Sequence, residues 1–315
     1  MTNMKAIQLQ GQAPPNVFLI ETDIPKPGLG TVLVKIRASA IQPSDLLNAK
    51  GGFPYTTFPR ICGRDYAGTI VSGPRSGENV YGTSGFTYAF TQDGFHAEYA
   101  LVAENALARK PTNLSFVQAA CIGVPFTTAK LIARKTEVKS SDIVLVIGAN
   151  GSVGSAVVQL TTALGCRVLT AGRNDNMDVN TDKDPELATV SALTDQHGVD
   201  VVIDTVGIPA TTTAAIKNMA HGGKIAIIAA PGDVNLTFDM KDLYRHEKSV
   251  IGCNSLSYDA QTLALDMAQL TLDFESGKLQ PSRDEVWTTV SLEKAVDVYK
   301  FGPKARAKFV IVMDH

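Results

Sequence analysis

The sequence has few cysteines and no pair of them at short spacing. Its four cysteines, Cys62, Cys121, Cys166 and Cys253, are scattered over 315 residues and form no Cys-x-x-Cys motif. This distribution argues against a disulfide framework and favours buried thiols in a reducing compartment. A cytoplasmic location is therefore expected.

Long apolar runs and an excess of charge of one sign are also missing. No apolar stretch reaches the roughly 18 residues that a membrane span requires. The opening segment MTNMKAIQLQGQAPP lacks the basic region and apolar core of a signal peptide. A formal net charge of −2 gives no general attraction to nucleic acid or to an acidic membrane surface. We expect neither as a partner.

The residues that are present follow two patterns along the chain. Up to residue 117, short β segments such as TVLVKIRA and YAGTIVSG alternate with turns rich in glycine and proline, which is typical of a small bent barrel. From 118 to 254, apolar strands such as IVLVIG and VDVVIDTVG alternate with helical stretches, which indicates a parallel sheet covered on both faces. The sequence thus predicts an α/β protein of two domains.

Two further segments bear on the domain boundaries. SFVQAACIGVPFTTAKLIARK predicts a helix at the change of pattern, with Ser115 in the N-cap position. After residue 255 a long amphipathic helix, DAQTLALDMAQLTLDFESGKL, precedes the strand KFVIVM, whose apolar core can return to the first domain. The expected domains are residues 1–117 together with 255–315, and residues 118–254.

The segment DIVLVIGANGSVGSAVVQL, residues 142–160, is a strand, a glycine turn and a helix in succession. The glycines allow a tight turn and a close approach to phosphates, whose charge the N–H groups and dipole of the new helix stabilise. An ordinary strand–helix turn is the alternative, because a lone glycine pattern is weak evidence. The position within a βαβ unit favours dinucleotide binding. The candidate phosphate-binding residues are Asn150, Gly151, Ser152, Val153 and Gly154.

The end of the next strand, RVLTAG, bears on which dinucleotide binds. A chain that binds NAD usually places Asp or Glu there, on the ribose 2′-hydroxyl. This chain has Gly172, Arg173 and Asn174 instead, and a guanidinium in place of a carboxylate suits a 2′-phosphate. The alternative is that Arg173 is an exposed loop arginine. We expect NADPH as the cofactor.

Taken together, these landmarks resemble the medium-chain dehydrogenase/reductase superfamily, and specifically its zinc-independent quinone oxidoreductase (zeta-crystallin-like) branch. The resemblance covers nearly the whole chain. It rests on MKAIQL, CGRDYAGTIVSG, DGFHAEYALV, AACIGVPFTTA, VLVIGANGSVGSAVVQLTTALG and VDVVIDTVG, which occur in the family's order. It implies a GroES-like β-barrel domain, a Rossmann domain that binds NADP, and a homodimer.

The resemblance also bears on metal binding. Zinc alcohol dehydrogenases of this superfamily carry a cysteine before the first helix, a histidine within Gly-His-Glu and a four-cysteine lobe. The matching positions here read Gln-Pro-Ser-Asp at 42–45 and Gly-Arg-Asp at 63–65, and the cysteine lobe is absent. The five histidines show no ligand spacing, and His96 is expected on a strand surface. No metal site is expected.

By the same resemblance, further positions are expected near the cofactor. Thr128 matches a threonine near the nicotinamide, and Gln42 takes the place of an asparagine that faces the cofactor. Plain packing is the alternative for each of these positions. The remaining expected contacts are Val206 in a loop after a strand, Ala229 and Ala230 at a strand end, and Asn254.

Two hydroxyls that related enzymes use are missing. The tyrosine that quinone reductases offer from the helix after Pro-Ser-Asp is Leu47 here, and the tyrosine that enoyl-thioester reductases use as a proton donor is Phe53. The proton can come from water or from Tyr55, Tyr66 or Tyr88. No catalytic residue is therefore assigned.

Two other segments differ from simple expectations. Between Gly172 and VDVVID the family has a helix, a strand and a second helix, whereas this segment is short, so we expect the first helix to be a loop. YRHEK, residues 244–248, has the Tyr-x-x-x-Lys spacing of the acid–base pair of short-chain reductases. The nucleotide turn comes too late in the chain for that family, and a strand follows YRHEK at once.

These observations predict an NADPH-dependent oxidoreductase that transfers hydride to quinones or α,β-unsaturated carbonyls without zinc. A conjugated acceptor suits a site without a Lewis acid because the developing charge spreads over an enolate. The alternatives are a non-catalytic NADPH-binding protein, crystallin-like or RNA-binding, and an enoyl-thioester reductase.

Overall fold

The computed structural model describes residues 3–11, 14–232, 234–302 and 307–313. The chain separates into two compact units, Met1–Thr127 with Ser255–His315, and Thr128–Asn254, which we call the first and the second unit. The units divide within helix α3 (Gly123–Thr136). The change that the sequence suggests after residue 117 therefore falls inside the first unit.

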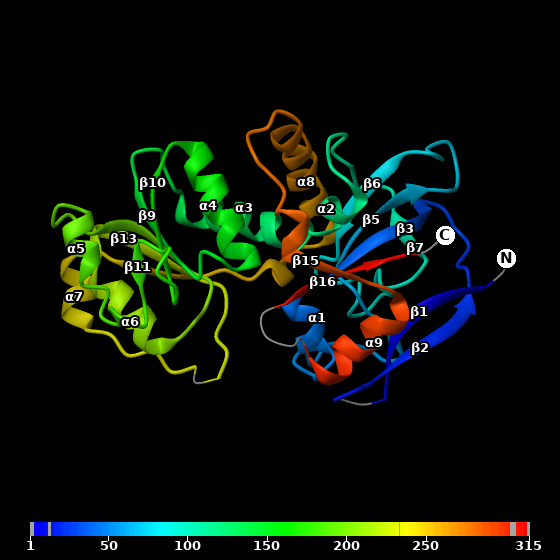
Figure 1. Ribbon diagram of the computed structural model, residues 1–315, viewed down its shortest axis with the longest axis horizontal. Helices are drawn as coiled ribbons and strands as arrows, with labels where there is room; N and C mark the ends of the chain where they lie inside the picture. Colours follow the sequence, from blue (N-terminus) through cyan, green and yellow to red (C-terminus); the bar gives the residue numbers. More distant parts are fainter. Residues whose placement is uncertain (1–2, 12–13, 233, 303–306, 314–315) are drawn as a thin grey trace. The chain divides into compact units, whose positions relative to one another are not determined.

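The second unit is built on a six-stranded sheet in the order β11-β10-β9-β12-β13-β14, with every pair parallel. Because parallel crossovers are right-handed, the helices of the two halves cover opposite faces, as α4 and α6 do in Figure 1. This is the doubly wound Rossmann arrangement that the sequence predicts. Its elements are β9 (Ile143–Ile147), α4 (Ser152–Leu164), β10 (Arg167–Gly172), β11 (Val179–Asn180), α5 (Thr189–Leu193), β12 (Val199–Asp204), α6 (Pro209–Lys217), β13 (Met219–Ile227), α7 (Met240–Arg245) and β14 (Ser249–Gly252).

Burial on both faces explains why the strands of the second unit are continuously apolar. In β9, Val144 and Val146 are buried on one face, and Leu145 on the other. α4 buries Ala156 and Val157. Each large apolar side chain removed from water contributes about 1.5–3 kcal/mol, so the sheet is held chiefly by this burial.

The helix predicted from Ser115 onward is instead two helices. Ser115 caps α2 (Phe116–Ala120) as expected, because its Oγ accepts a hydrogen bond from the N–H of Gln118. The chain then breaks and α3 begins at Gly123. The reason is Pro125, whose ring would clash with the carbonyl four residues earlier in a continuous helix but is tolerated in the first turn of a new one.

The expected loop in the shortened segment is confirmed. After β10 the chain runs through residues 173–178 without a helix, forms the short strand β11 and reaches α5. The Asp178 carboxylate accepts hydrogen bonds from both the N–H and the hydroxyl of Thr170, each at 2.7 Å. The loop is thereby tied back onto β10.

The first unit contains a seven-stranded sheet in the order β15-β16-β3-β5-β6-β8, with β7 also paired to β3, and a three-stranded sheet β2-β1-β4. The strands of the larger sheet bend around one apolar core, which is the GroES-like β domain that the sequence predicts. Its elements are β1 (Asn3–Gln10), β2 (Asn16–Asp23), β3 (Thr31–Ile41), α1 (Pro43–Asn48), β4 (Arg60–Ile61), β5 (Asp65–Ile70), β6 (Asn79–Thr83), β7 (Tyr99–Ala103), β8 (Ala108–Arg109), α2, α8 (Ala260–Glu275), β15 (Trp287–Val290), α9 (Leu292–Phe301) and β16 (Lys308–Val312).

The C-terminal segment closes the first unit. β16 pairs antiparallel with β3, so that Val310 lies opposite Ala40. Helix α8 is fixed to β6 by the Tyr81 hydroxyl, which donates to the carbonyl of Met267 at 2.7 Å. The return of the last strand to the N-terminal β segments is thus as the sequence indicates.

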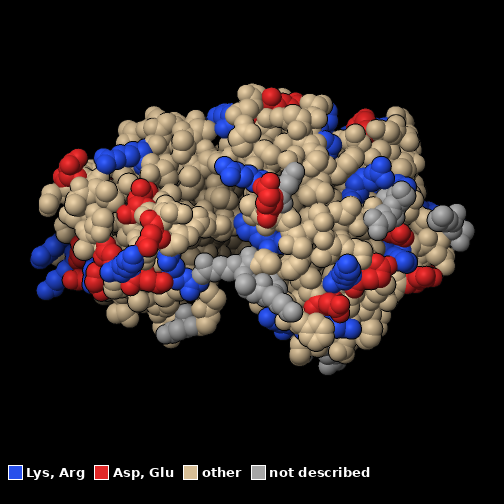
Figure 2. All heavy atoms as spheres, in the orientation of Figure 1, with Lys and Arg blue, Asp and Glu red and all other residues tan. Residues whose placement is uncertain are grey.

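The surface and the thiols also agree with the composition. On the face shown in Figure 2, Lys and Arg side chains are interspersed with Asp and Glu, in keeping with the net charge of −2. All four cysteines are free and buried. Within the described residues, every helix is too short or too polar to cross a membrane.

Candidate functional site

The glycine turn of the second unit joins β9 to α4. Gly148 has a φ of +79°, and a Cβ there would lie 2.5 Å from the hydroxyl oxygen of Thr205. A Cβ on Gly154 would overlap the carbonyl oxygen of Gly148. The turn is closed by the N–H of Gly151, which donates to the same carbonyl at 2.8 Å. Gly148 is thus required for the backbone conformation, and Gly154 for the close packing of the helix on the turn.

The first turn of α4 presents backbone N–H groups without a side-chain cap. Its N-cap is Gly151, in an extended conformation with φ −69° and ψ 168°, which has no side chain to accept a hydrogen bond. The N–H groups of Ser152 and Val153 have no acceptor within the helix, and the first turn carries no acidic residue. Such an end stabilises an anion through its dipole and donors, so the segment Asn150–Gly154 fits a pyrophosphate.

A loop after β12 lies against this turn. The buried Asp204 carboxylate accepts hydrogen bonds from the N–H groups of Val206 and Gly207, each at 2.9 Å, and from the Thr212 hydroxyl. Asp204 therefore fixes the loop as a carboxylate cap. Sequence reasoning did not single it out, although an aspartate at a strand end followed by Thr-Val-Gly was a usable signal.

The structure brings several of the predicted cofactor residues to one edge of the second unit's sheet. Val206 packs against Gly148, since a Cβ there would lie 2.6 Å from the Val206 side chain. Gly207 of the same loop lies directly against the backbone of Ala229 and Ala230, beyond the end of β13. These positions follow the carboxyl ends of β9, β12 and β13, where open α/β sheets bind ligands.

Thr128 on α3 has an unsatisfied polar atom. Its side chain is 5% exposed, and its hydroxyl oxygen makes no hydrogen bond within the described part of the chain. Buried hydroxyls are normally hydrogen-bonded, so this one fits a partner that the protein itself does not supply. Asn254, expected beside the cofactor, follows β14 as the last residue of the second unit.

The corner after β10 leaves a guanidinium uncommitted. Arg173 and Asn174 are exposed, and Arg173 makes no ion pair or hydrogen bond with the residues described. The nearby carboxylate of Asp175 is bound instead by Lys183, at 2.6 Å, and by the side-chain amide of Asn180. An arginine without an acidic partner is what a 2′-phosphate requires.

Gln42, the predicted cofactor residue of the first unit, belongs to a buried polar network. Its side-chain amide donates to the Asp65 carboxylate at 2.8 Å, and its N–H donates to the Asp45 carboxylate at 2.7 Å. Asp65 also accepts from the N–H of Val124. Burial raises the pKa of Asp45 to about 7 and the pKa of Asp65 to about 6.

The same network contains a buried arginine. The Nε of Arg64 donates to the hydroxyl of Ser84 and its Nη1 donates to the hydroxyl of Ser44, each at 2.9 Å. Burial lowers the pKa of this guanidinium, and the negative charges of Asp65 and Asp45 act in the opposite direction. Sequence reasoning noted Arg64 only as a departure from the zinc ligands and assigned it no role.

His96 is not on a strand surface as expected, but fully buried. Its Nε2 donates to the carbonyl of Ala40 at 3.1 Å, so its Nδ1 accepts from the Tyr299 hydroxyl at 2.9 Å. Burial lowers the pKa of His96 to about 4, which keeps the ring neutral. The reason is the bend at Gly63, where a Cβ would overlap the imidazole. Within the described residues no group of three or more His, Cys, Asp or Glu side chains could hold a metal ion.

The three candidate tyrosines differ in exposure. Tyr66 is buried with its hydroxyl unpaired among the described residues, and its ring lies 4.2 Å from that of Phe95. Tyr88 is also a buried residue, and its hydroxyl accepts from the N–H of Ala103. Tyr55 alone of the three is exposed, at 43%, and Leu47 is exposed at 48%. The structure therefore leaves Tyr55 as the accessible hydroxyl of this set.

The Tyr-x-x-x-Lys spacing at 244–248 does not form an acid–base pair. Tyr244 is exposed at the end of α7. The ammonium of Lys248 is instead buried, where it donates to the carbonyl of Ile216 at 2.9 Å and pairs with Asp242 at 2.8 Å. The lysine therefore stabilises the end of α6 and does not serve as the partner of Tyr244 that a short-chain reductase needs.

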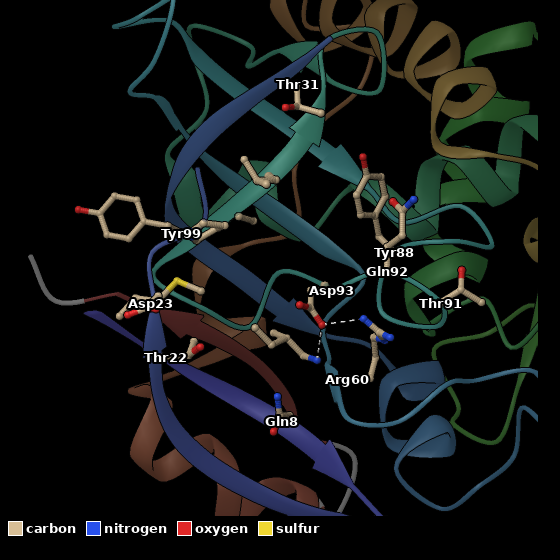
Figure 3. A pocket seen from close by; sticks show the side chains of 16 residues that line it. Gln8, Thr22, Asp23, Thr31, Arg60, Tyr88, Thr91, Gln92, Asp93 and Tyr99 are labelled. Atoms are coloured by element: carbon tan, nitrogen blue, oxygen red, sulfur yellow. Dashed lines mark hydrogen bonds and ion pairs between the residues drawn. The ribbon is translucent and has the colours of Figure 1, made fainter. Parts of the chain in front are cut away.

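A hollow of about 490 Å³ lies in the first unit. Figure 3 shows Gln8 entering it from β1 and Gln92 from the loop before β7, with the Asp93 carboxylate bonded to the guanidinium of Arg60 at 2.8 Å. Tyr88 also lines it, but the hydroxyl of this tyrosine is already bonded to Ala103. None of the predicted cofactor-binding residues lines this hollow.

Comparison with known proteins defines the class. The family described as "Alcohol dehydrogenase GroES-like domain" matches residues 28–112, and "Zinc-binding dehydrogenase" matches residues 152–269. A zinc-type alcohol dehydrogenase-like protein of Schizosaccharomyces pombe is 45% identical over 98% of this chain and 97% of its own. The quinone oxidoreductase of Homo sapiens is 26% identical over 98% of each chain. The crystal structure of an alcohol dehydrogenase superfamily protein from Novosphingobium aromaticivorans matches with a TM-score of 0.85 at 25% identity, over 99% of this chain and 100% of that chain.

These matches extend over both units. A GroES-like domain combined with a Rossmann sheet, and whole-chain similarity to such enzymes, identify the protein as an oxidoreductase. The chain belongs to the medium-chain dehydrogenase/reductase superfamily.

Proposed function

We propose that the protein is an NADPH-dependent reductase that passes hydride to quinones or α,β-unsaturated carbonyls without zinc. The similarity to quinone oxidoreductases over almost the whole chain supports the reaction class. The main support for dinucleotide binding is the first turn of α4, which has no side-chain cap and follows the glycine turn. It offers free N–H donors to a phosphate, and the glycines leave room for the phosphate to approach them.

Arg173 supports NADPH over NADH. Its guanidinium is exposed and unpaired among the described residues, at the strand end where the ribose of a bound dinucleotide is recognised. The two nearest acidic residues of the loop, Asp175 and Asp178, are bound to Lys183 and Thr170. A phosphate therefore meets a free cation there, whereas a ribose hydroxyl finds no free carboxylate.

The residues at the ligand positions of zinc enzymes support metal-free chemistry. Arg64 stands in place of the histidine, and a guanidinium has no lone pair to give to a metal. The Asp65 carboxylate already accepts hydrogen bonds from Val124 and Gln42. This donor set does not fit a zinc ion.

Each part of the chain then has a defined task. The bound dinucleotide would supply the hydride, and the N–H groups of α4 would hold its pyrophosphate. Asp204 fixes the loop of Val206, and Thr128 offers a buried hydroxyl that lacks a protein partner. These groups orient the cofactor, which is the main contribution that a protein makes to hydride transfer.

The edge of the second unit supports a homodimer. β14 is the outer strand of the sheet, and its Val250 side chain is exposed. An unpaired edge with an apolar side chain is suited to pairing with a second copy about a twofold axis. The four free, buried cysteines support our expectation of a cytoplasmic protein.

Turnover is tested with purified protein, NADPH and a panel of quinones, enones and enals, by following the absorbance of the reduced nicotinamide. Oxidation of NADPH by at least one conjugated acceptor is expected, with simple ketones unreactive. No oxidation across the panel would remove the proposal, and thermal stabilisation by NADPH without turnover would favour the non-catalytic alternative.

The phosphate assignment is tested by Arg173→Asp. Loss of a charge-assisted contact costs about 1.5–3 kcal/mol, so the affinity for NADPH is expected to fall about ten- to a hundredfold while the affinity for NADH changes little. Arg245→Asp, the same change on exposed α7, is the matched control. An unchanged preference in Arg173→Asp would contradict the assignment.

A further inference from the structure

Arg64 is a buried cation that lacks a direct acidic partner. It is 3% exposed, and its hydrogen bonds end on two neutral hydroxyls, those of Ser84 and Ser44. Among the residues that the structure describes, no carboxylate lies within ion-pair distance of this guanidinium, and its Nη2 makes no hydrogen bond. Two N–H donors of a fixed, fully charged group therefore remain available.

The two carboxylates that act on Arg64 through space, Asp45 and Asp65, form no ion pair with its guanidinium among the described residues. Asp45 accepts from the N–H of Gln42, and Asp65 accepts from Val124 and from the Gln42 amide. Their negative charges offset part of the cost of burying the guanidinium, but they leave its Nη2 donors without an acceptor. Donors placed in this way suit a negatively charged oxygen on a ligand.

Aromatic side chains adjoin the guanidinium. Its Cζ lies 5.8 Å from the ring centroid of Phe90, and the ring of Tyr55 lies 5.2 Å from that of Phe90. The Tyr55 side chain is 43% exposed, whereas Phe90 is fully buried. An exposed aromatic ring near a buried cation suits a planar conjugated molecule with one electron-rich oxygen.

We propose that Arg64 binds the carbonyl oxygen of the acceptor through its Nη2 donors and stabilises the negative charge that reduction places there. The proposal rests on the reductase function above and names the group that replaces a Lewis acid. An arginine in the position of a zinc-ligating histidine would thus supply a positive charge by another means.

The electron balance of the step defines what Arg64 does. The acceptor would gain a hydride at the β-carbon of its conjugated double bond, and the reduced nicotinamide that supplies it would be left oxidised. The π electrons of the carbon–carbon double bond would form a new bond to the carbonyl carbon, the π electrons of the carbonyl would move to its oxygen, and a proton from water would complete the product. Arg64 keeps its own proton throughout, so it stabilises the oxygen and is not the proton donor.

Kinetics of Arg64→Gln and Arg64→Lys test this role. Removal of one donor to a developing oxyanion costs about a hundred- to a thousandfold in kcat, so Arg64→Gln is expected to lose at least about a hundredfold. The lysine variant is expected to recover part of this loss because it restores the charge. Arg60→Gln, which removes an arginine bonded to Asp93, is the matched control and is expected to keep wild-type turnover.

A binding measurement gives a readout that does not depend on turnover. The probe is para-nitrophenol, whose ionised form carries an aromatic ring and a conjugated oxyanion and absorbs visible light. The wild type with oxidised NADP is expected to bind the phenolate in preference to the phenol, which lowers the pKa of the bound probe by about one unit or more. Arg64→Gln is expected to abolish this shift, and Arg60→Gln to retain it.

The outcomes separate the two proposals. If the wild type reduces acceptors and Arg64→Gln does so equally well, the role of Arg64 is overturned while the reductase function stands. If no acceptor is reduced, the reductase function fails, and a phenolate shift that needs Arg64 still supports the oxyanion site. Absence of any shift in the wild type counts against Arg64. Thermal unfolding of each variant shows whether a loss of turnover is explained by destabilisation alone, through the lost contacts of Arg64 with Ser44 and Ser84.

Discussion

The second unit offers its candidate binding groups through the backbone, whereas the first unit offers them through charged side chains that folding has buried. At the glycine turn, space comes from missing Cβ atoms at Gly148 and Gly154, and charge comes from the N–H groups of α4. Around Arg64, charge comes from side chains, and Asp45 and Asp65 lie within the same buried network.

The two arrangements differ in what they cost the fold. The N–H groups at a helix start lack partners in any helix, so directing them at a ligand adds little to the cost of folding. A buried guanidinium or carboxylate loses its hydration and must be compensated by neighbours. Cofactor binding at the glycine turn should therefore respond to added side-chain volume. The stability of the buried network of Arg64, Asp45 and Asp65 should respond to changes of charge and of pH.

Added volume at the turn is expected to give the largest effect. In Gly154→Ala the new Cβ overlaps the carbonyl oxygen of Gly148, so the turn or the helix must shift. The affinity for NADPH is expected to fall at least about a hundredfold, or about 3 kcal/mol, in a fluorescence titration of the reduced cofactor.

Gly151→Ala is the matched control for this change. It adds the same atom three residues earlier, but its φ of −69° suits alanine and its Cβ would lie 3.1 Å from the Gly148 carbonyl oxygen. Its loss of affinity should be much smaller. If both variants lose the same affinity, the position of the added Cβ does not matter, and close packing at Gly154 is not the reason for the loss.

Sequence reasoning reached the second unit more easily because its signals are local. The strand, the glycine spacing and the new helix lie within residues 142–160, and the loop after β10 could be recognised from the shortness of one segment. Just before the second unit begins, Pro125 divides a helix that the apolar stripe alone predicts as continuous. The role of Asp204 required knowing which N–H groups its carboxylate reaches.

The buried polar network of the first unit could not be predicted from the sequence, because it is assembled from distant segments of the chain. Arg64 bonds to Ser44 and Ser84, and Asp65 bonds to Val124, so no short window of sequence contains the network. Burial of His96 likewise depends on how Gly63 bends the chain beneath it. Composition and spacing give no measure of such burial, which sets the charge chemistry of this unit.

A smaller effect, with pH as the variable, tests the cost of buried charge at Asp45. Burial raises its pKa from 3.8 to about 7, so between these values the folded state holds a proton that the unfolded state has released. Stability of the wild type therefore falls as pH rises through this window and levels off above it. Asp45→Asn cannot ionise, so inside the window its stability relative to the wild type should rise by about 1.4 kcal/mol per pH unit, or about 2 kcal/mol between about pH 5 and about pH 6.5, measured by urea unfolding.

Asp175→Asn is the contrasting control, because Lys183 lowers the pKa of the exposed Asp175 and the relative stability of that variant should decline slightly with rising pH. A difference between Asp45→Asn and the wild type that does not change with pH would show that Asp45 is charged at little cost, and the contrast between the two units would then rest on Arg64 alone.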